Sequence, residues 1–187
     1  TEPGAGWPYD TILASLAAAP ASTPAQFGTI IVNRYYESYG NDETQSAVNL
    51  ANVGALAASI DSFADTMIAS WNTDKAAVKA ASDDVIAKAS AAVIASKAGS
   101  SYRAHGIAIN FPTAGADPDY TADNSAFAGD TSWPAFLNEF SAKMAGSWIA
   151  NARNMAQTFD GEPFTDLKHF CLNISNYNDP VTGYTET

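Results

Sequence analysis

The sequence predicts an α/β fold that is rich in helix and has few strands. Apolar residues recur every three or four positions over much of the 187 residues, which is the spacing of amphipathic helices. Alternation typical of a strand is clearest at Ile107, Ile109 and Phe111, just before Pro112. Two or three strands are too few for a complete sheet. We therefore expect part of a layered structure whose sheet is completed by a further segment or chain.

Two helices are expected in the first forty residues. The first covers 11–19 and is stopped by Pro20, because proline cannot continue a helix. Thr23 is typical of an N-cap, and Pro24 suits the first position of the second helix. Gly40 is the expected end of that helix.

A short strand over 44–50 is expected to precede two long helices. The apolar residues over 53–71 step by three or four positions, which indicates an amphipathic helix. The segment 74–97 is rich in alanine, the best helix former, and Gly99 is a natural stop. The sequence therefore predicts a second long helix over 74–97.

The last third is expected to hold a loop, one helix and a turn-rich tail. Gly, Asp, Pro and Asn are frequent over 113–131, which is typical of a loop. Thr131 and Ser132 then cap a helix over 133–148. Turn signals surround a short apolar piece, 170–174. No linker or repeat divides the chain, so 1–187 is expected to be a single domain or a processed subunit.

Composition and charge exclude several classes of protein. Twenty Asp and Glu residues against nine Lys and Arg give a net charge of −11, which repels nucleic-acid phosphates. No apolar run reaches the roughly 18 residues that span a membrane. The single cysteine allows no internal disulfide, and this scarcity suits a cytosolic or an exported bacterial protein alike. Nucleic-acid binding and membrane insertion are therefore not expected.

Five segments stand out by their order and spacing. They are EPGAGWPYDTIL, IIVNRYYESYG, TQSAVNLANVGALAASI, HGIAINFP and FAGDTSWPAFLNEF. Together they resemble the C-terminal half of the clostripain-like cysteine peptidases. The resemblance covers 1–140 and is poor between Trp71 and Tyr102, while 141–187 forms the end of the last helix and a C-terminal tail. It implies a caspase-like three-layer sandwich and an endopeptidase that commonly cleaves after Arg or Lys.

The resemblance also implies that the catalytic residues lie outside this chain. In the family, the catalytic His follows one strand in an HG-type turn and the catalytic Cys follows the next in a DxC motif, both before the PGxGWPY loop. Thr1 is therefore expected to be a severed end, with an N-terminal segment or light chain of the same precursor as partner. Alone, the chain is expected to be inactive. A secreted, cell-surface or periplasmic bacterial location is expected.

A second interpretation belongs to a different class of protein. The chain could be a structural or protein-interaction subunit that keeps the peptidase fold and has lost the chemistry. The upstream sequence distinguishes the two, because a DxC motif about two to three dozen residues before Thr1 indicates the enzyme.

The resemblance places substrate binding in the opening loop, which could also be a plain tight turn. Glycines let backbone groups approach a substrate, and a carboxylate would pair with its basic side chain. The position between the two glycines, often acidic in the family, is Ala5, so we expect a weakened preference for Arg and Lys. The expected substrate-binding residues are Glu2, Gly4, Ala5, Gly6, Trp7 and Asp10.

His105 and Cys171 could be mistaken for a catalytic dyad. A cysteine nucleophile needs an imidazole within hydrogen-bond reach. However, Cys171 has no acidic residue two positions before it and no small-residue turn after it. We expect Cys171 to be a small buried hydrophobe. His105 and His169 are expected to be ordinary surface or partly buried histidines.

A cluster of aspartates lies in the predicted loop. Ca²⁺ prefers several oxygen ligands at close range, and the resemblance implies Ca²⁺ for some family members. The D-x-D-x-x-x-D spacing lacks the glycine and terminal glutamate of an EF-hand loop, so turn-forming roles are favoured. The residues are Asp117, Asp119, Asp123 and Asp130. The sequence itself requires no metal or cofactor.

Overall fold

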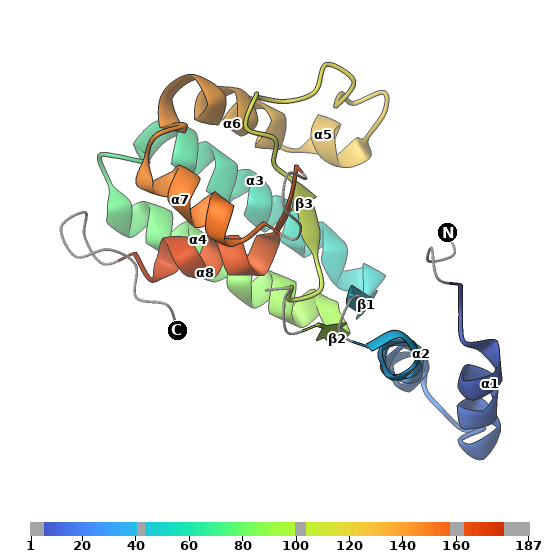
Figure 1. Cartoon of the computed structure of the whole chain (residues 1–187). Helices are drawn as coiled ribbons and strands as arrows, with labels where there is room; N and C mark the ends of the chain where they lie inside the picture. The colour runs from blue at the N-terminus through green and yellow to red at the C-terminus, as the bar shows by residue number, and fades with distance from the viewer. Residues whose placement is uncertain (1–5, 41–43, 100–103, 158–162, 178–187) are drawn as a thin grey trace.

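The computed structural model describes residues 6–40, 44–99, 104–157 and 163–177 (Figure 1). Within these residues the fold is helix-rich α/β, with two separate two-stranded sheets. None of the helices in this described part is long and apolar enough to cross a membrane.

Helices α1 (Tyr9–Ala18) and α2 (Pro24–Tyr39) pack against each other and confirm the expected pair. Thr23 begins α2 with a capping box. Its hydroxyl accepts a hydrogen bond from the Gln26 amide at 3.3 Å, and the Gln26 side chain accepts one from the Thr23 amide at 2.8 Å. Gly40, with φ +73°, ends the helix as predicted. In Figure 1, α1 lies at the outside of the molecule, next to α2.

The first sheet joins β1 (Thr44–Val48) to β2 (Val93–Ala98) in antiparallel register. A short 3₁₀ turn, η2 (Leu50–Asn52), connects β1 to the long helix α3 (Val53–Ser70). Helix α3 packs along α4 (Lys75–Ala92), and α2 packs against both strands. The expected strand and the helix after it are therefore confirmed.

The predicted helix over 74–97 is wrong in its last turns. Helix α4 ends at Ala92, and the chain turns directly into strand β2 at Val93. Val93 and Ile94 are β-branched and lose side-chain freedom in a helix. Pairing with β1 gives the backbone groups of β2 their hydrogen bonds, so tertiary structure overrides the helix propensity of the alanines.

The second sheet contains the strand expected before Pro112. Strand β3 (Ala108–Asn110) pairs antiparallel with β4 (Phe164–Asp166), with Ile109 opposite Thr165. The pairing extends beyond the strand, because the Phe111 amide donates to the Pro163 carbonyl at 2.6 Å. The partner strand lies in the segment that the sequence predicts only as a turn-rich tail.

The helix predicted over 133–148 is broken. Helix α6 (Trp133–Glu139) runs into a π-helical segment, η3 (Phe140–Met144), and α7 (Trp148–Met155) begins after it. The break follows from Ser147, whose hydroxyl accepts from the Ile149 amide at 3.2 Å and so caps a new helix.

Two more short helices differ from the sequence prediction. Helix α5 (Ala126–Asp130) lies within the predicted loop, where Ser125 supplies its N-cap. The short apolar piece at 170–174 belongs to helix α8 (Leu167–Ser175), which packs against α4 and α7. The C-terminal part thus contributes to the core rather than forming a simple tail.

Phe111 lies at the centre of the core. Its ring makes edge contacts with four aromatic rings from α6, η3 and α8, at centroid distances of 4.7–5.5 Å. These rings belong to Trp133, Phe136, Phe140 and Phe170. The Phe111 carbonyl accepts two hydrogen bonds from the buried Arg153 guanidinium, at 2.9 Å from Nε and 2.7 Å from Nη2.

Gly106 joins the two sheets by a close backbone approach. Its φ is +106°, and a methyl placed on it would lie 3.1 Å from both γ-methyls of Val93 and 3.3 Å from Cβ of Ser46. The Ser46 hydroxyl donates to the Gly106 carbonyl at 2.7 Å. Only glycine suits both the backbone angle and the space.

We expect Gly106→Ala to lower the free energy of unfolding by about 2–4 kcal/mol, because it adds backbone strain to overpacking. The control is Gly54→Ala in α3, where a methyl would meet no atom within 4 Å and φ is not in the left-handed region. That change should be neutral or stabilise by up to about 1 kcal/mol. Urea denaturation of both variants measures the difference, and equal stabilities would contradict the close approach.

Candidate functional site

The expected substrate loop leads into helix α1. Gly6 has φ +77°, as a tight turn requires, and the Trp7 ring packs edge-on against Tyr35 of α2 at 5.7 Å. Asp10 lies exposed in the first turn of α1. The other three expected residues lie outside the described part: Glu2, Gly4 and Ala5.

An apolar pocket of about 310 Å³ lies beside this loop, between α1 and α2. Trp7, Tyr9, Leu13 and Phe27 are among the residues that line it, and the side chains of its described lining are uncharged. Asp10 is not part of the lining. The pocket therefore offers apolar contact, and a carboxylate for a basic side chain would have to come from beyond it.

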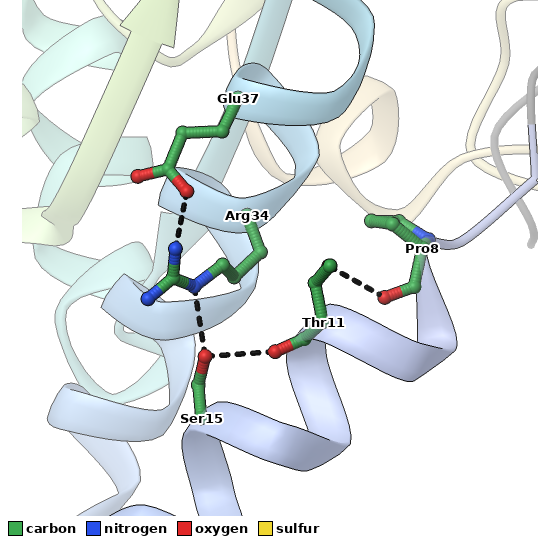
Figure 2. Close-up of polar contacts among 5 residues, drawn as sticks. All are labelled: Pro8, Thr11, Ser15, Arg34 and Glu37. Atoms are coloured by element: carbon green, nitrogen blue, oxygen red, sulfur yellow. Dashed lines mark hydrogen bonds and ion pairs between the residues drawn. The ribbon is translucent and has the colours of Figure 1, made fainter.

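A chain of hydrogen bonds attaches α1 to α2 (Figure 2). The Thr11 hydroxyl donates to the Pro8 carbonyl at 3.1 Å, and the Ser15 hydroxyl donates to the Thr11 carbonyl at 2.7 Å. Arg34 of α2 donates from Nε to the Ser15 hydroxyl at 2.8 Å and forms an ion pair with Glu37. Because Pro8 follows Trp7 directly, this network also holds the end of the loop.

Cys171 is a buried residue of α8 with no exposed surface. Burial raises the pKa of its thiol far above the ordinary value, and the carboxylates of Asp166 and Asp83 raise it further. The thiolate is the nucleophilic form of cysteine, so this residue is chemically inert. The expectation of a small buried hydrophobe is confirmed.

His105, Asp166 and His169 form a cluster at the start of α8. The Asp166 carboxylate accepts the His105 amide at 2.7 Å and the His169 amide at 2.8 Å, the second as N-cap of the helix. Nε2 of His105 lies 3.4 Å from Nδ1 of His169, and the ring planes are 11° from parallel. His105 thus contacts the other histidine of the chain.

Sequence reasoning missed this cluster. His105 lies 61 residues before Asp166 and 64 residues before His169, and pairing of β3 with β4 brings the three together. One local signal was available, because an aspartate three residues before His169 at the start of an apolar run is typical of an N-cap. Burial raises the pKa of Asp166, with partial compensation from its two amide donors and from nearby positive charge.

Two pockets meet along strand β3. A polar pocket of about 270 Å³ lies at the start of the strand and is lined by Ser46, Lys97 and Asp166, among others. An apolar pocket of about 220 Å³ lies further along, against Leu56 and Ile60 of α3. They share two lining residues, Ile107 and Ala108, so they form one groove that is polar at one end and apolar at the other.

The edge of β3 that faces away from β4 carries unpaired backbone groups. Ala108 lies opposite Asp166, whose amide donates instead to Ala156 at 2.8 Å. The Leu167 amide donates to the Ile107 carbonyl, so the pairs Ile107–Leu167 and Ile109–Thr165 are the hydrogen-bonded ones. Ala108 lies between them, and the amide and carbonyl of Ala108 therefore point away from β4. Within the described residues neither group has a bonding partner, and Ala108 is exposed. The strand edge is therefore open at Ala108, whereas at Asn110 the carbonyl accepts a hydrogen bond from the Trp133 indole at 2.9 Å.

The aspartate-rich loop shows turn chemistry. The Asp117 carboxylate accepts the Asp119 amide at 2.8 Å, which closes an Asx turn. Across the ranges that the structure describes, no three His, Cys, Asp or Glu side chains are grouped so as to hold a metal ion.

Residues 1–105 match the model of the clostripain family. The match covers more than half of the chain and runs from the opening loop through β2 to His105, so the chain belongs to the clostripain family. This membership indicates a hydrolase of the cysteine-peptidase type that acts on proteins or peptides. Searches of curated proteins and of solved structures give no match.

We expect Asp166→Ala to lower the free energy of unfolding by about 1–3 kcal/mol, because two amides lose their acceptor. The raised pKa of Asp166 in the folded state means that its contribution is largest at low pH and declines as pH rises through that pKa. The stability gap between the wild type and Asp166→Ala should therefore widen from pH 7 to pH 4.

Urea denaturation at several pH values measures this gap. Asp166→Asn is the control, since it keeps one acceptor and does not titrate. Its stability should exceed that of Asp166→Ala by an amount independent of pH. A gap between wild type and Asp166→Ala that narrows on acidification would contradict the direction of the pKa shift.

Proposed function

We propose that this chain is the C-terminal, non-catalytic part of a clostripain-family cysteine endopeptidase. The observation that carries the proposal is the state of Cys171. It is the only cysteine in the sequence, and it is buried with a raised thiol pKa. Cysteine peptidases attack the scissile carbonyl with a thiolate. The nucleophile and its histidine therefore come from a segment outside these 187 residues.

The proposed role of the chain in catalysis is substrate binding. The loop formed by Glu2, Gly4, Ala5, Gly6, Trp7 and Asp10 would approach the peptide through its glycine backbone. The apolar pocket next to Trp7 supports this role, since peptide sites combine apolar walls with a few polar groups. With Ala5 between the glycines, a preference for Arg or Lys would depend on Glu2 or Asp10.

The proposed partner completes the sheet. The open edge at Ala108 offers an amide and a carbonyl to an extended strand, which is the usual way in which a sheet edge accepts a second segment. The adjoining groove supports a strand with polar side chains near Lys97 and apolar ones near Leu56 and Ile60. A strand from the catalytic segment would fill it and build the caspase-like sandwich. We propose an exported bacterial protein.

Peptide cleavage tests the main proposal. The 187-residue chain alone should not cleave a panel of fluorogenic peptides, because it holds no accessible thiolate. Co-expression with the sequence encoded immediately upstream of Thr1 should restore cleavage. Cys171→Ala in the assembled protein should then keep kcat/KM within about twofold, whereas alanine in place of the upstream cysteine should abolish it.

Three results would overturn this assignment. Cleavage by the isolated chain that disappears in Cys171→Ala would make Cys171 the nucleophile. An assembled protein that binds peptides without cleaving any would favour the non-catalytic interaction subunit. An upstream sequence without cysteine would do the same.

We expect Ala108→Pro to weaken binding of the catalytic segment about tenfold, equivalent to about 1.4 kcal/mol. Proline removes the amide that points out of the sheet and leaves the bonds between β3 and β4 in place. Ala108→Ser keeps the amide and serves as the control. Titration calorimetry with the separated segment gives the affinities, and thermal melting checks that both variants fold. Unchanged affinity in Ala108→Pro would exclude pairing at this edge.

A further inference from the structure

We propose that Arg34 is a positioning residue for the substrate loop and acts through Ser15 of helix α1. The inference rests on the proposed function, because it takes this loop to bind peptide. Arg34 donates from Nε to the Ser15 hydroxyl at 2.8 Å, and this partly buried bond joins α2 to α1 (Figure 2). The two residues are 19 positions apart, so the bond is a contact between helices rather than within one.

Helix α1 has one deep contact besides this bond. Its ten residues are fewer than the roughly 12 that an isolated helix needs in water, so it depends on tertiary contacts. Pro8 supplies no side-chain cap at its start, and Ile12 is its one buried residue. A single apolar contact leaves a short helix free to tilt about that point. Ser15 lies three residues after Ile12 on the same face, so its bond to Arg34 is the second point that sets the direction of α1.

The direction of α1 is passed to the loop through the first turn of the helix. The Ser15 hydroxyl donates to the Thr11 carbonyl at 2.7 Å, and the Thr11 hydroxyl donates to the Pro8 carbonyl at 3.1 Å. The Trp7 carbonyl accepts the Tyr9 amide at 2.9 Å. A tilt of α1 therefore moves the end of the substrate loop with it.

Neighbouring residues of α2 hold both the loop and the helix. The buried Tyr35 contacts the Trp7 ring edge-on at a centroid distance of 5.7 Å, and Arg34 holds α1 through Ser15. Helix α2 in turn packs against strands β1 and β2. The aromatic contact fixes the place of the loop relative to the first sheet, and the Arg34 bond fixes the angle at which the chain leaves it.

The geometry requires an arginine at this position. One terminal nitrogen, Nη1, pairs with Glu37 one turn further along α2, while Nε bonds to Ser15. A planar guanidinium donates to two partners in fixed directions, whereas a lysine ammonium is a point charge on a flexible stem. The exposed pair with Glu37 adds little stability, and it orients the guanidinium toward α1. Arg34→Lys is therefore not expected to replace Arg34.

Fluorine NMR of the 187-residue chain labelled with fluorotryptophan tests the placement of the loop without any need for cleavage. Trp7→Phe assigns the Trp7 signal. In Ser15→Ala and in Arg34→Lys this signal should shift or broaden, while those of the other three tryptophans stay in place. Ser90→Ala is the matched control, because the exposed Ser90 hydroxyl also donates to a carbonyl one turn earlier, that of Ile86, at 2.7 Å. A Trp7 signal unchanged in both test variants would overturn the proposal.

Peptide kinetics of the assembled protein test what the placement does. Ser15→Ala and Arg34→Lys should each raise KM about three- to tenfold and keep kcat within about twofold, since a displaced loop weakens binding of substrate and transition state alike. Where the assembly binds peptides without cleaving them, Kd takes the place of KM. The double variant should be no worse than the single ones, because both remove the same contact. Ser15→Thr should restore KM to within about twofold, because its hydroxyl can make the same bonds.

The outcomes separate this proposal from the one on which it rests. Alanine is a better helix former than serine, so a role limited to the stability of α1 predicts an unchanged KM in Ser15→Ala. That result would overturn the positioning role even where the assembled protein cleaves peptides. An assembly that neither cleaves nor binds any peptide would overturn the proposed function together with this inference.

Discussion

The contact between the Phe111 carbonyl and the Arg153 guanidinium is the constraint on which the rest of the fold depends. A buried cation is costly unless its donors are bonded, and burial lowers the pKa of Arg153 from its ordinary value. The carbonyl meets this need with two bonds from one guanidinium. Because Pro112 follows, strand β3 ends here, and α7 is held against that end.

The same residue positions the aromatic core. The Phe111 ring meets side chains from the continuous segment α6–η3 and from α8, so two segments that are separate in sequence pack on one strand end. Strand β3 is thereby bonded to β4 on one edge and anchored at its end. Its other edge remains open at Ala108, beside the groove. A fold built to support one edge of a strand and expose the other suits a protein that receives a further strand.

Much of the fold was predictable because it rests on local chemistry. Thr23, Gly40 and Pro112 act within a few residues of themselves, and they begin or end elements where expected. The helical spacing of apolar residues likewise identified α3. The candidate site was less predictable. Burial of Cys171 followed from its sequence context, whereas its effect on function depends on how completely α8 is covered.

The sequence by itself determined the helix-rich class, the caps, the strand before Pro112, the acidic charge and the relation to the clostripain family, because each depends on residue type and short spacing. Only the tertiary structure decided that Val93 starts a strand rather than extending α4, since its partner β1 lies more than forty residues earlier. It also decided that His105 meets His169 on Asp166. Such contacts depend on which segments pack together, and no local pattern encodes that.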